Sequence, residues 1–106
     1  MPIVDVVIPV RGALPALRRC IDSLHASRNA TGFELVVVDD ANIEPELVRY
    51  LDELRTQHRA TIVAQPSRQG YTASVNRAVA LHRDRDVVVL QSDAEVANDW
   101  LDRLRA

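Results

Sequence analysis

The stretch VVVLQSDAEV, residues 87–96, is an apolar run that breaks abruptly into polar and acidic residues. A strand with one face in water alternates apolar and polar side chains, which residues 87–90 do not do. A continuous apolar run of this kind is typical of a strand buried on both faces of a parallel sheet. Ser92, Asp93 and Glu95 follow at the carboxyl end of the strand, the edge at which open α/β sheets bind ligands. The sequence therefore predicts a buried strand whose end carries a candidate site.

Similar apolar runs lie earlier in the chain, with helical patterns between them. Strands are predicted at residues 3–10, 33–40, 60–65 and 86–91. Apolar residues recur at helical spacing after each strand, and the last of these helices begins near Trp100, with Asn98 or Asp99 as its expected cap. Strands that alternate with helices predict an α/β fold with a Rossmann-like, doubly wound, mainly parallel sheet flanked by helices.

The size and composition of the chain are those of a soluble globular domain. Its 106 residues suffice for one core, so a single domain is expected over residues 1–106. A net charge of -2 leaves no basic surface for nucleic acid, and we expect no such partner. No apolar run is long enough to cross a bilayer and no signal peptide is recognisable. We therefore expect a cytoplasmic protein, with membrane association only through segments not present in this chain.

Several classes of site are excluded by residues that the chain lacks. Because it has no lysine, it has neither a P-loop lysine nor a Schiff-base nucleophile. The turn PVRGALPALRR after the first strand contains only Gly12, so the G-x-G-x-x-G cradle of dinucleotide-binding enzymes is missing. Cys20, the single cysteine, lies on the apolar face of the first predicted helix, where core packing is its expected role.

Carboxylates follow two of the four predicted strands. Asp39 and Asp40 end the second strand and Asp93 follows the fourth, and in a doubly wound sheet these ends lie along one edge. Converging carboxylates suit a hard divalent cation that completes its shell with water and phosphate oxygens. The alternative is that each aspartate only caps the helix or turn after its strand. For two strand ends of one sheet, we favour the functional interpretation.

Five segments follow one another in the order VVIPV, LRRCIDSL, ELVVVDDAN, RQGYTASVNRA and VVVLQSDAEVANDWLDRL. In this order and spacing they resemble the N-terminal, nucleotide-binding half of family 2 glycosyltransferases, nucleotide-sugar transferases with the A-type fold. The likeness covers nearly the whole chain. It implies that residues 1–106 are the donor-binding part of a larger transferase domain.

The resemblance implies roles for nine residues beside a nucleotide-diphosphate sugar. Asp39 is expected to hydrogen-bond the base, a pyrimidine of a UDP- or dTDP-type donor, with Asp40 near the ribose. Asp93, the last residue of the family's D-x-D motif, is expected to hold Mg²⁺ or Mn²⁺ against the diphosphate. The family's strand order makes the fourth strand central and places Arg11 across the crevice from Asp93. The implied donor-binding residues are Pro9, Val10, Arg11, Asp39, Asp40, Gly70, Asn76, Ser92 and Asp93.

The chain departs from the family pattern at four places, which include Arg68 for a common asparagine and Ala41-Asn42 for glycine-serine. Gln91 stands where the first aspartate of D-x-D is usual, which leaves the motif one carboxylate. Arg11 and Gly12 replace a common tyrosine-asparagine pair, so base stacking at that position does not carry over.

The resemblance also implies that no catalytic residue lies in this chain. In inverting members of the family, a carboxylate from the second half of the domain is the general base. We therefore expect donor binding without sugar transfer. A non-catalytic nucleotide-binding module and a structural or assembly module of the same fold are the alternatives. An open sheet edge also favours a homo-oligomer.

Overall fold

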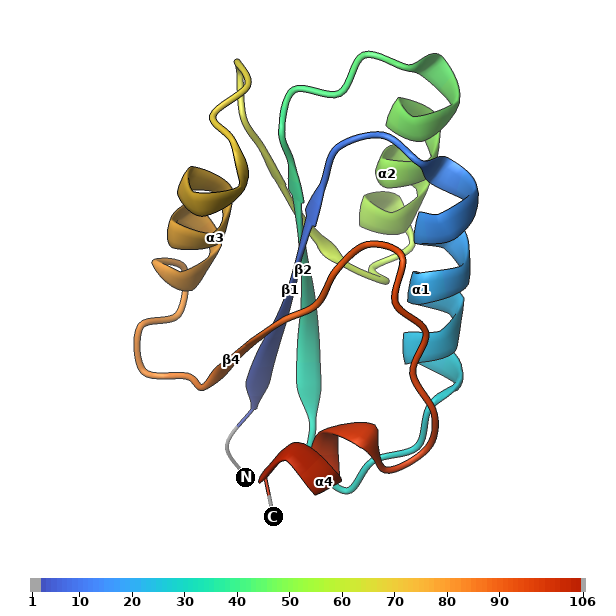
Figure 1. The fold of residues 1–106 in the computed structure, drawn as a ribbon, viewed down its shortest axis with the longest axis vertical. Helices are drawn as coiled ribbons and strands as arrows, with labels where there is room; N and C mark the ends of the chain where they lie inside the picture. The colour runs from blue at the N-terminus through green and yellow to red at the C-terminus, as the bar shows by residue number, and fades with distance from the viewer. Residues whose placement is uncertain (1–2, 106) are drawn as a thin grey trace.

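Strands and helices alternate along the chain, as the sequence predicts. The computed structural model describes residues 3–105. The elements are β1 (Val4–Val10), α1 (Leu14–Ala26), β2 (Phe33–Asp39), α2 (Pro45–Thr56), β3 (Thr61–Ala64), α3 (Tyr71–Val79), β4 (Val87–Val89) and α4 (Trp100–Arg105). Figure 1 shows α3 on one side of the strands and α1 and α2 on the other.

The four strands form one parallel sheet in the order β3-β2-β1-β4. β1 pairs with β2 from Val4↔Phe33 to Val10↔Asp39, and it pairs with β4 on its other side. The chain therefore moves outward from β1 to β3 and then returns to place β4 beside β1. Such a reversal is the topological switch point at which open α/β sheets form their ligand crevice. The predicted doubly wound sheet is confirmed.

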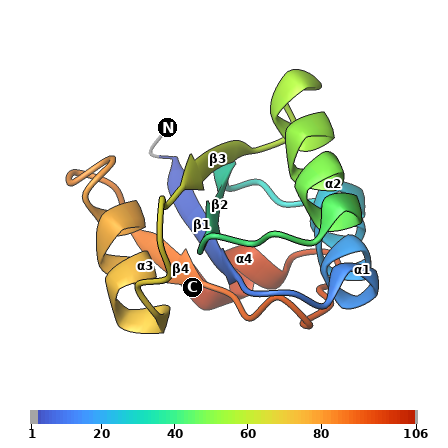
Figure 2. The same ribbon diagram turned by 90° about the horizontal axis from the view of Figure 1, so that it is seen from above.

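Alternation along β1 divides the interior into two cores. Val6, Ile8 and Val10 point to one face of the sheet and pack in a large core with α1 and α2. Val7 points to the other face and packs with Ala78 of α3 in a smaller core. Figure 2, seen from above, shows α3 on one side of the sheet and α1 and α2 on the other.

The position of β4 corrects one expectation. The sequence predicts a central strand at residues 86–91 that is buried on both faces, whereas β4 is a short strand at the edge of the described sheet. Val89 is 38% exposed. The apolar run nevertheless contacts both layers, since Val87 packs against the α3 core and Leu90 against the larger core. Because this apolar run contacts both cores, its residues do not alternate between apolar and polar even though β4 is not a central strand.

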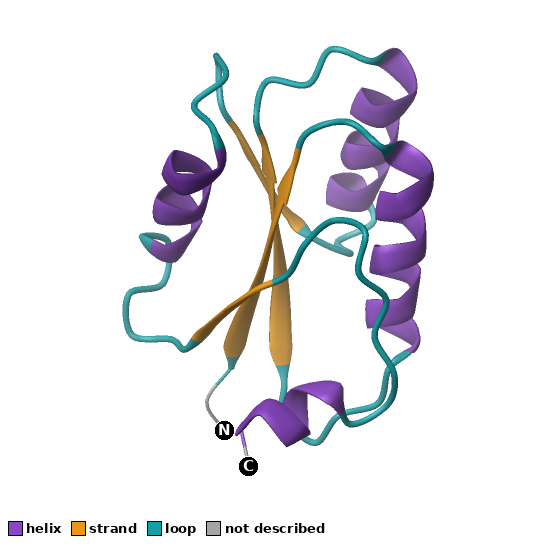
Figure 3. Cartoon of the chain, in the orientation of Figure 1, coloured by secondary structure: helices purple, strands orange, loops and turns teal. Residues whose placement is uncertain are grey.

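A long loop carries the chain from β4 to α4 across the α1 side of the sheet (Figure 3). The backbone N–H of Val96 donates to Ser23 Oγ of α1 at 3.0 Å. Where this loop reaches α4, Asn29, which lies between α1 and β2, caps the helix. Its Oδ1 accepts from the backbone N–H of Leu101 at 3.0 Å. Of the two predicted caps, Asp99 occupies the N-cap position, since its carbonyl accepts from the backbone N–H of Arg103 at 2.9 Å, whereas Asn98 instead accepts from the backbone N–H of Arg28.

The predicted core role of Cys20 leads to a test of thiol reactivity. Its side chain is fully buried, and burial, followed by the charges of Asp93 and Glu95, raises the pKa of the thiol to about 11. Because the thiolate is the reactive form, iodoacetamide at pH 8 is expected to leave the folded chain unlabelled and to label it in urea. Mass spectrometry measures the labelling. Rapid labelling of the folded chain would contradict the buried position.

Candidate functional site

Asn42 joins the carboxyl ends of β1 and β2. Its side-chain N–H donates to the backbone carbonyl of Val10 at 2.9 Å, and its Oδ1 accepts from the backbone N–H of Gly12 at 2.9 Å. Asp39 Oδ1 accepts from the backbone N–H of Asn42 at 3.0 Å and from its side chain at 2.6 Å. These bonds fix the turn after β1 against the end of β2, so both ends form one rigid edge.

Asp40 holds the start of α3. Its side chain is buried, and Oδ1 accepts from the backbone N–H of Gln69 at 2.7 Å and from Gln65 Nε2 at 2.9 Å. Oδ2 accepts from the backbone N–H of Gly70 at 3.1 Å. The Gln69 N–H, ahead of the other donors, keeps the pKa of the carboxyl below its ordinary value despite the opposing effect of burial. Asp40 is thus a structural anchor for the segment before α3.

An open pocket of about 330 Å³ lies at the carboxyl ends of β1 and β4. Three predicted donor-binding residues line it together: Pro9 at the end of β1, and Ser92 and Asp93 in the loop after β4. Ala13, Tyr71 and Gln91 complete its lining. This pocket stands at the topological switch point, where the fold predicts a ligand site.

The other predicted residues do not line this pocket. Asp39 points to the α2 side, where it lines a separate pocket of about 120 Å³ with Val48 and Ile62. Alternation explains this position, because Leu35 and Val37 of β2 also face the α1 and α2 core.

The four further predicted residues are Val10, Gly70, Arg11 and Asn76, and none of them lines this pocket. Val10 is buried in the larger core, and Gly70 serves as the N-terminal residue before α3 with a φ of 90°. Arg11 and Asn76 are exposed, so the expected approach of Arg11 to Asp93 is not seen in the pocket lining.

Asp93 suits the role of a metal ligand. Its side chain is exposed, and no residue that the structure describes donates a hydrogen bond to it. The amide oxygen of Gln91 and the hydroxyl of Ser92 line the same pocket, and oxygen ligands of these kinds are those that Mg²⁺ and Mn²⁺ take. A single carboxylate is sufficient when water and phosphate oxygens complete the shell. The residues present therefore fit a divalent cation.

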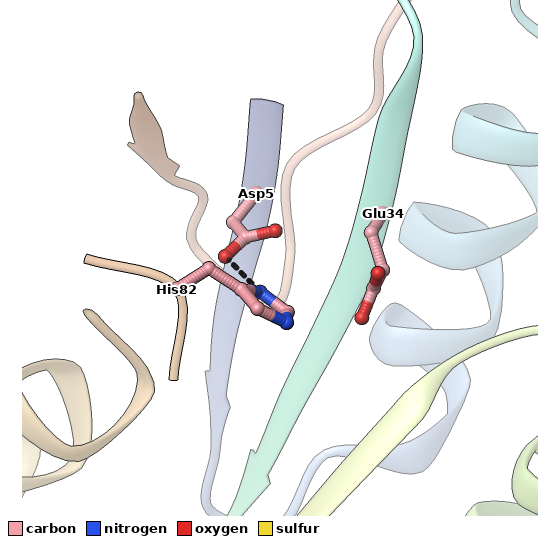
Figure 4. A group of neighbouring side chains, drawn as sticks. All are labelled: Asp5, Glu34 and His82. Atoms are coloured by element: carbon pink, nitrogen blue, oxygen red, sulfur yellow. Dashed lines mark hydrogen bonds and ion pairs between the residues drawn. The ribbon is translucent and has the colours of Figure 1, made fainter. Parts of the chain in front are cut away.

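A second acidic group lies at the opposite, amino-terminal end of β1 and β2. Asp5, Glu34 and His82 place potential ligand atoms within 4.8 Å of one another (Figure 4). His82 Nδ1 lies 2.7 Å from Asp5 Oδ2. Arg85 Nη1 donates to Asp5 at 2.9 Å and to Glu34 at 3.0 Å. The guanidinium thus supplies the positive charge that a metal ion would bring, and we interpret the group as an ion-pair network.

The same end of the sheet has a larger pocket of about 520 Å³, with His25, His58 and Arg59 in its lining. Its size exceeds that of the pocket at Asp93. The smaller pocket is nevertheless the better candidate, because it lies at the carboxyl ends of the strands and contains an exposed carboxylate without a hydrogen-bond donor among the described residues.

The comparison with protein families decides the classification. The sequence profile of glycosyl transferase family 2 matches residues 5–106. The chain belongs to this family. A curated relative, uncharacterized protein y4gI of Sinorhizobium fredii (strain NBRC 101917 / NGR234), is 33% identical over 107 residues. The match covers 99% of this chain and 12% of that protein, so this family 2 chain spans about an eighth of its relative.

Solved structures confirm the A-type glycosyltransferase fold. S. aureus TarS 1–349 in complex with UDP superposes with a TM-score of 0.78 at 19% identity, over 99% of this chain and 31% of that one. The complex of the same protein with UDP-GlcNAc gives 0.77 at 18% identity, over 99% and 30%. The mannosyltransferase PcManGT of Pyrobaculum calidifontis, in complex with GDP-Man and Mn²⁺, gives 0.65 at 26% identity, over 87% and 28%.

Among residues 3–105, no helix has the length and apolar character needed to cross a membrane.

The sequence did not identify two residues at the carboxyl ends of the strands, Asn42 and Tyr71. Asn42 is an asparagine three residues after Asp39, a spacing typical of turns in which an aspartate side chain binds the backbone, so turn chemistry could have identified it. Tyr71 enters the pocket from α3, and no local pattern distinguishes it from a surface tyrosine.

Asp40→Asn is expected to destabilise the chain by about 1–3 kcal/mol at neutral pH, because an amide replaces an acceptor of backbone N–H groups. The folded pKa of Asp40 lies below its ordinary value of 3.8, so its contribution is present above that value and is lost as pH falls through the folded pKa. Urea unfolding from pH 7 to pH 2.5 should show the gap between wild type and variant closing at low pH. Asp84→Asn, at an exposed aspartate, is the control. A gap independent of pH would contradict the anchoring role.

Arg85→Ala is expected to lower the urea midpoint far more than Arg83→Ala, a change at an exposed neighbour. The reason is that Asp5 is fully buried and would lose its bond to the guanidinium. EDTA should leave the wild-type midpoint unchanged if the guanidinium is the positive charge of the cluster. A fall in the midpoint with EDTA, restored by a divalent cation, would instead identify a metal site at Asp5, Glu34 and His82.

Proposed function

We propose that this chain binds the nucleotide-diphosphate sugar of a glycosyltransferase together with Mg²⁺ or Mn²⁺. The observation that carries the proposal is the convergence of Pro9, Ser92 and Asp93 on one pocket at the switch point of a family 2 chain. The complexes of structural relatives with UDP, UDP-GlcNAc and GDP-Man support a nucleotide-sugar ligand. A UDP- or dTDP-type donor is favoured by the likeness of the segment that contains Asp39.

In this proposal Asp93 holds the cation, with Gln91 and Ser92 beside it, and Pro9 forms the surface under the nucleotide. The cation would stabilise the negative charge of the departing nucleoside diphosphate as a Lewis acid. The hydrogen bonds of Asn42 and Asp40 hold the edges of the pocket before the donor arrives, which reduces the ordering required on binding.

The proposal assigns no general base to this chain. The solved relatives are about three to five times longer than the segment that this chain matches, since it covers 19–31% of them. We propose that residues 1–106 form the donor-binding part of a longer transferase domain and that a carboxylate elsewhere in that domain deprotonates the acceptor. A nucleotide-binding module without transfer activity is the remaining alternative. Family membership disfavours a purely structural module.

Calorimetric titration of the 106-residue chain with UDP tests donor binding. Binding is expected in the presence of Mn²⁺ and is expected to weaken at least tenfold without it, because the cation links the diphosphate to Asp93. Asp93→Ala should lose the dependence on Mn²⁺, and Asp39→Ala should weaken binding indirectly, because Asp39 holds the Asn42 turn at the ends of β1 and β2. Asp84→Ala, which changes an exposed aspartate away from the pocket, is the matched control.

Two outcomes would count against the proposal. Failure of the folded wild-type chain to bind UDP with Mn²⁺ would exclude an independent donor site. Binding that is unaffected by Asp93→Ala would place the metal elsewhere. Transfer of sugar by a longer chain that contains these residues then separates an enzyme from a binding module.

A further inference from the structure

Tyr71 is an exposed aromatic residue in the wall of the candidate donor pocket. The residue is 60% exposed and lies at the first position of α3. It is the only aromatic residue among those that line this pocket in the described chain. Large aromatic side chains that remain exposed inside a pocket are commonly ligand contacts.

Hydrogen bonds to buried residues fix the backbone that presents Tyr71. Asp40 accepts from the backbone N–H groups of Gln69 and Gly70, the two residues before the tyrosine. Ser74 Oγ donates to the carbonyl of Gly70 at 2.7 Å and accepts from Gln65 Nε2 at 3.0 Å. The first turn of α3 is thereby attached to the end of β2, while the ring of Tyr71 remains outside these bonds.

The pocket has an apolar side and a polar side. Pro9 alternates with the residues of β1 that face the larger core, so it lies on the α3 side of the sheet, as Tyr71 does. Gln91, Ser92 and Asp93 supply oxygen and nitrogen atoms from the loop after β4. A ligand with a flat apolar ring at one end and a charged group at the other matches this division.

We propose that the ring of Tyr71 stacks on the base of the donor nucleotide while the diphosphate lies toward Asp93. This inference rests on the proposed function and adds the residue that recognises the heterocycle. A nucleobase matches a tyrosine ring better than a sugar does, because it is planar and has a π-face. The residues after β1, Arg11 and Gly12, offer no aromatic surface, so this contact comes from α3 in this chain.

Calorimetric titrations with two probes separate stacking from binding of the diphosphate. UDP with Mn²⁺ contains the base, whereas pyrophosphate with Mn²⁺ contains only the group expected at Asp93. Tyr71→Leu is expected to weaken UDP binding about 5- to 150-fold, the range for loss of one base stack. It should leave pyrophosphate binding unchanged. Tyr71→Phe keeps the ring and should retain UDP affinity within about twofold.

Val79→Ala, at an exposed apolar residue on the same helix but outside the pocket lining, is the matched control. Circular dichroism establishes that each variant is folded. Equal affinity of Tyr71→Leu and wild type for UDP would overturn the stacking inference and leave donor binding intact. Equal losses for UDP and pyrophosphate would also overturn it, because the residue would then act on the diphosphate site. A wild-type chain that binds neither probe overturns the proposed function as well.

Discussion

The alternation of side chains along β1 is the constraint on which the rest of the molecule depends. β1 pairs on both edges, so its side chains can point only to the two faces of the sheet. Val6, Ile8 and Val10 face the α1 and α2 core. Asp5 and Pro9 face the α3 side, where Asp5 pairs with Arg85 at one end and Pro9 lines the candidate pocket at the other. One strand thereby positions the ion-pair network, the core and the pocket.

The sequence leaves two interpretations open for the carboxylates at the strand ends, a capping role and a binding role. Asp40 and Asp93 differ in which of these roles their surroundings favour. Asp40 is buried and accepts hydrogen bonds from two backbone N–H groups and one side chain, as a capping residue does. Asp93 is exposed and receives no hydrogen bond from the residues described, as suits a carboxylate that binds a cation. The Asp39–Asp40 pair therefore does not act as one unit, because neighbouring residues at a strand end point to opposite faces.

The alternating elements and the parallel sheet could be predicted from the sequence, because hydrophobic periodicity is a local signal and crossovers follow general rules, whereas the place of β1 beside β4 is implied only by the family resemblance. The edge position of β4 could not be predicted in this way. An apolar run indicates contact with two layers, but it does not indicate whether the strand pairs on one edge or on both. His82 binds Asp5 across 77 positions of the chain, and Asn29 caps α4 across 72. Partners so distant are set by the packed fold, which local patterns do not encode. The same reason explains why Tyr71 went unrecognised.

The hydrogen bonds at the carboxyl edge of the sheet make the backbone around the proposed donor site rigid. The side chains of Asn42 and Asp40 together hold the ends of β1 and β2 and the start of α3 through hydrogen bonds to backbone groups. The side chains of Tyr71 and Asp93 extend from this frame and make no hydrogen bond with the residues described. When the walls of a pocket are already fixed, little binding free energy is lost in ordering the protein. In the proposed donor site, Asp40 would support recognition of the donor without touching it, because its carboxylate fixes the turn from which Tyr71 projects.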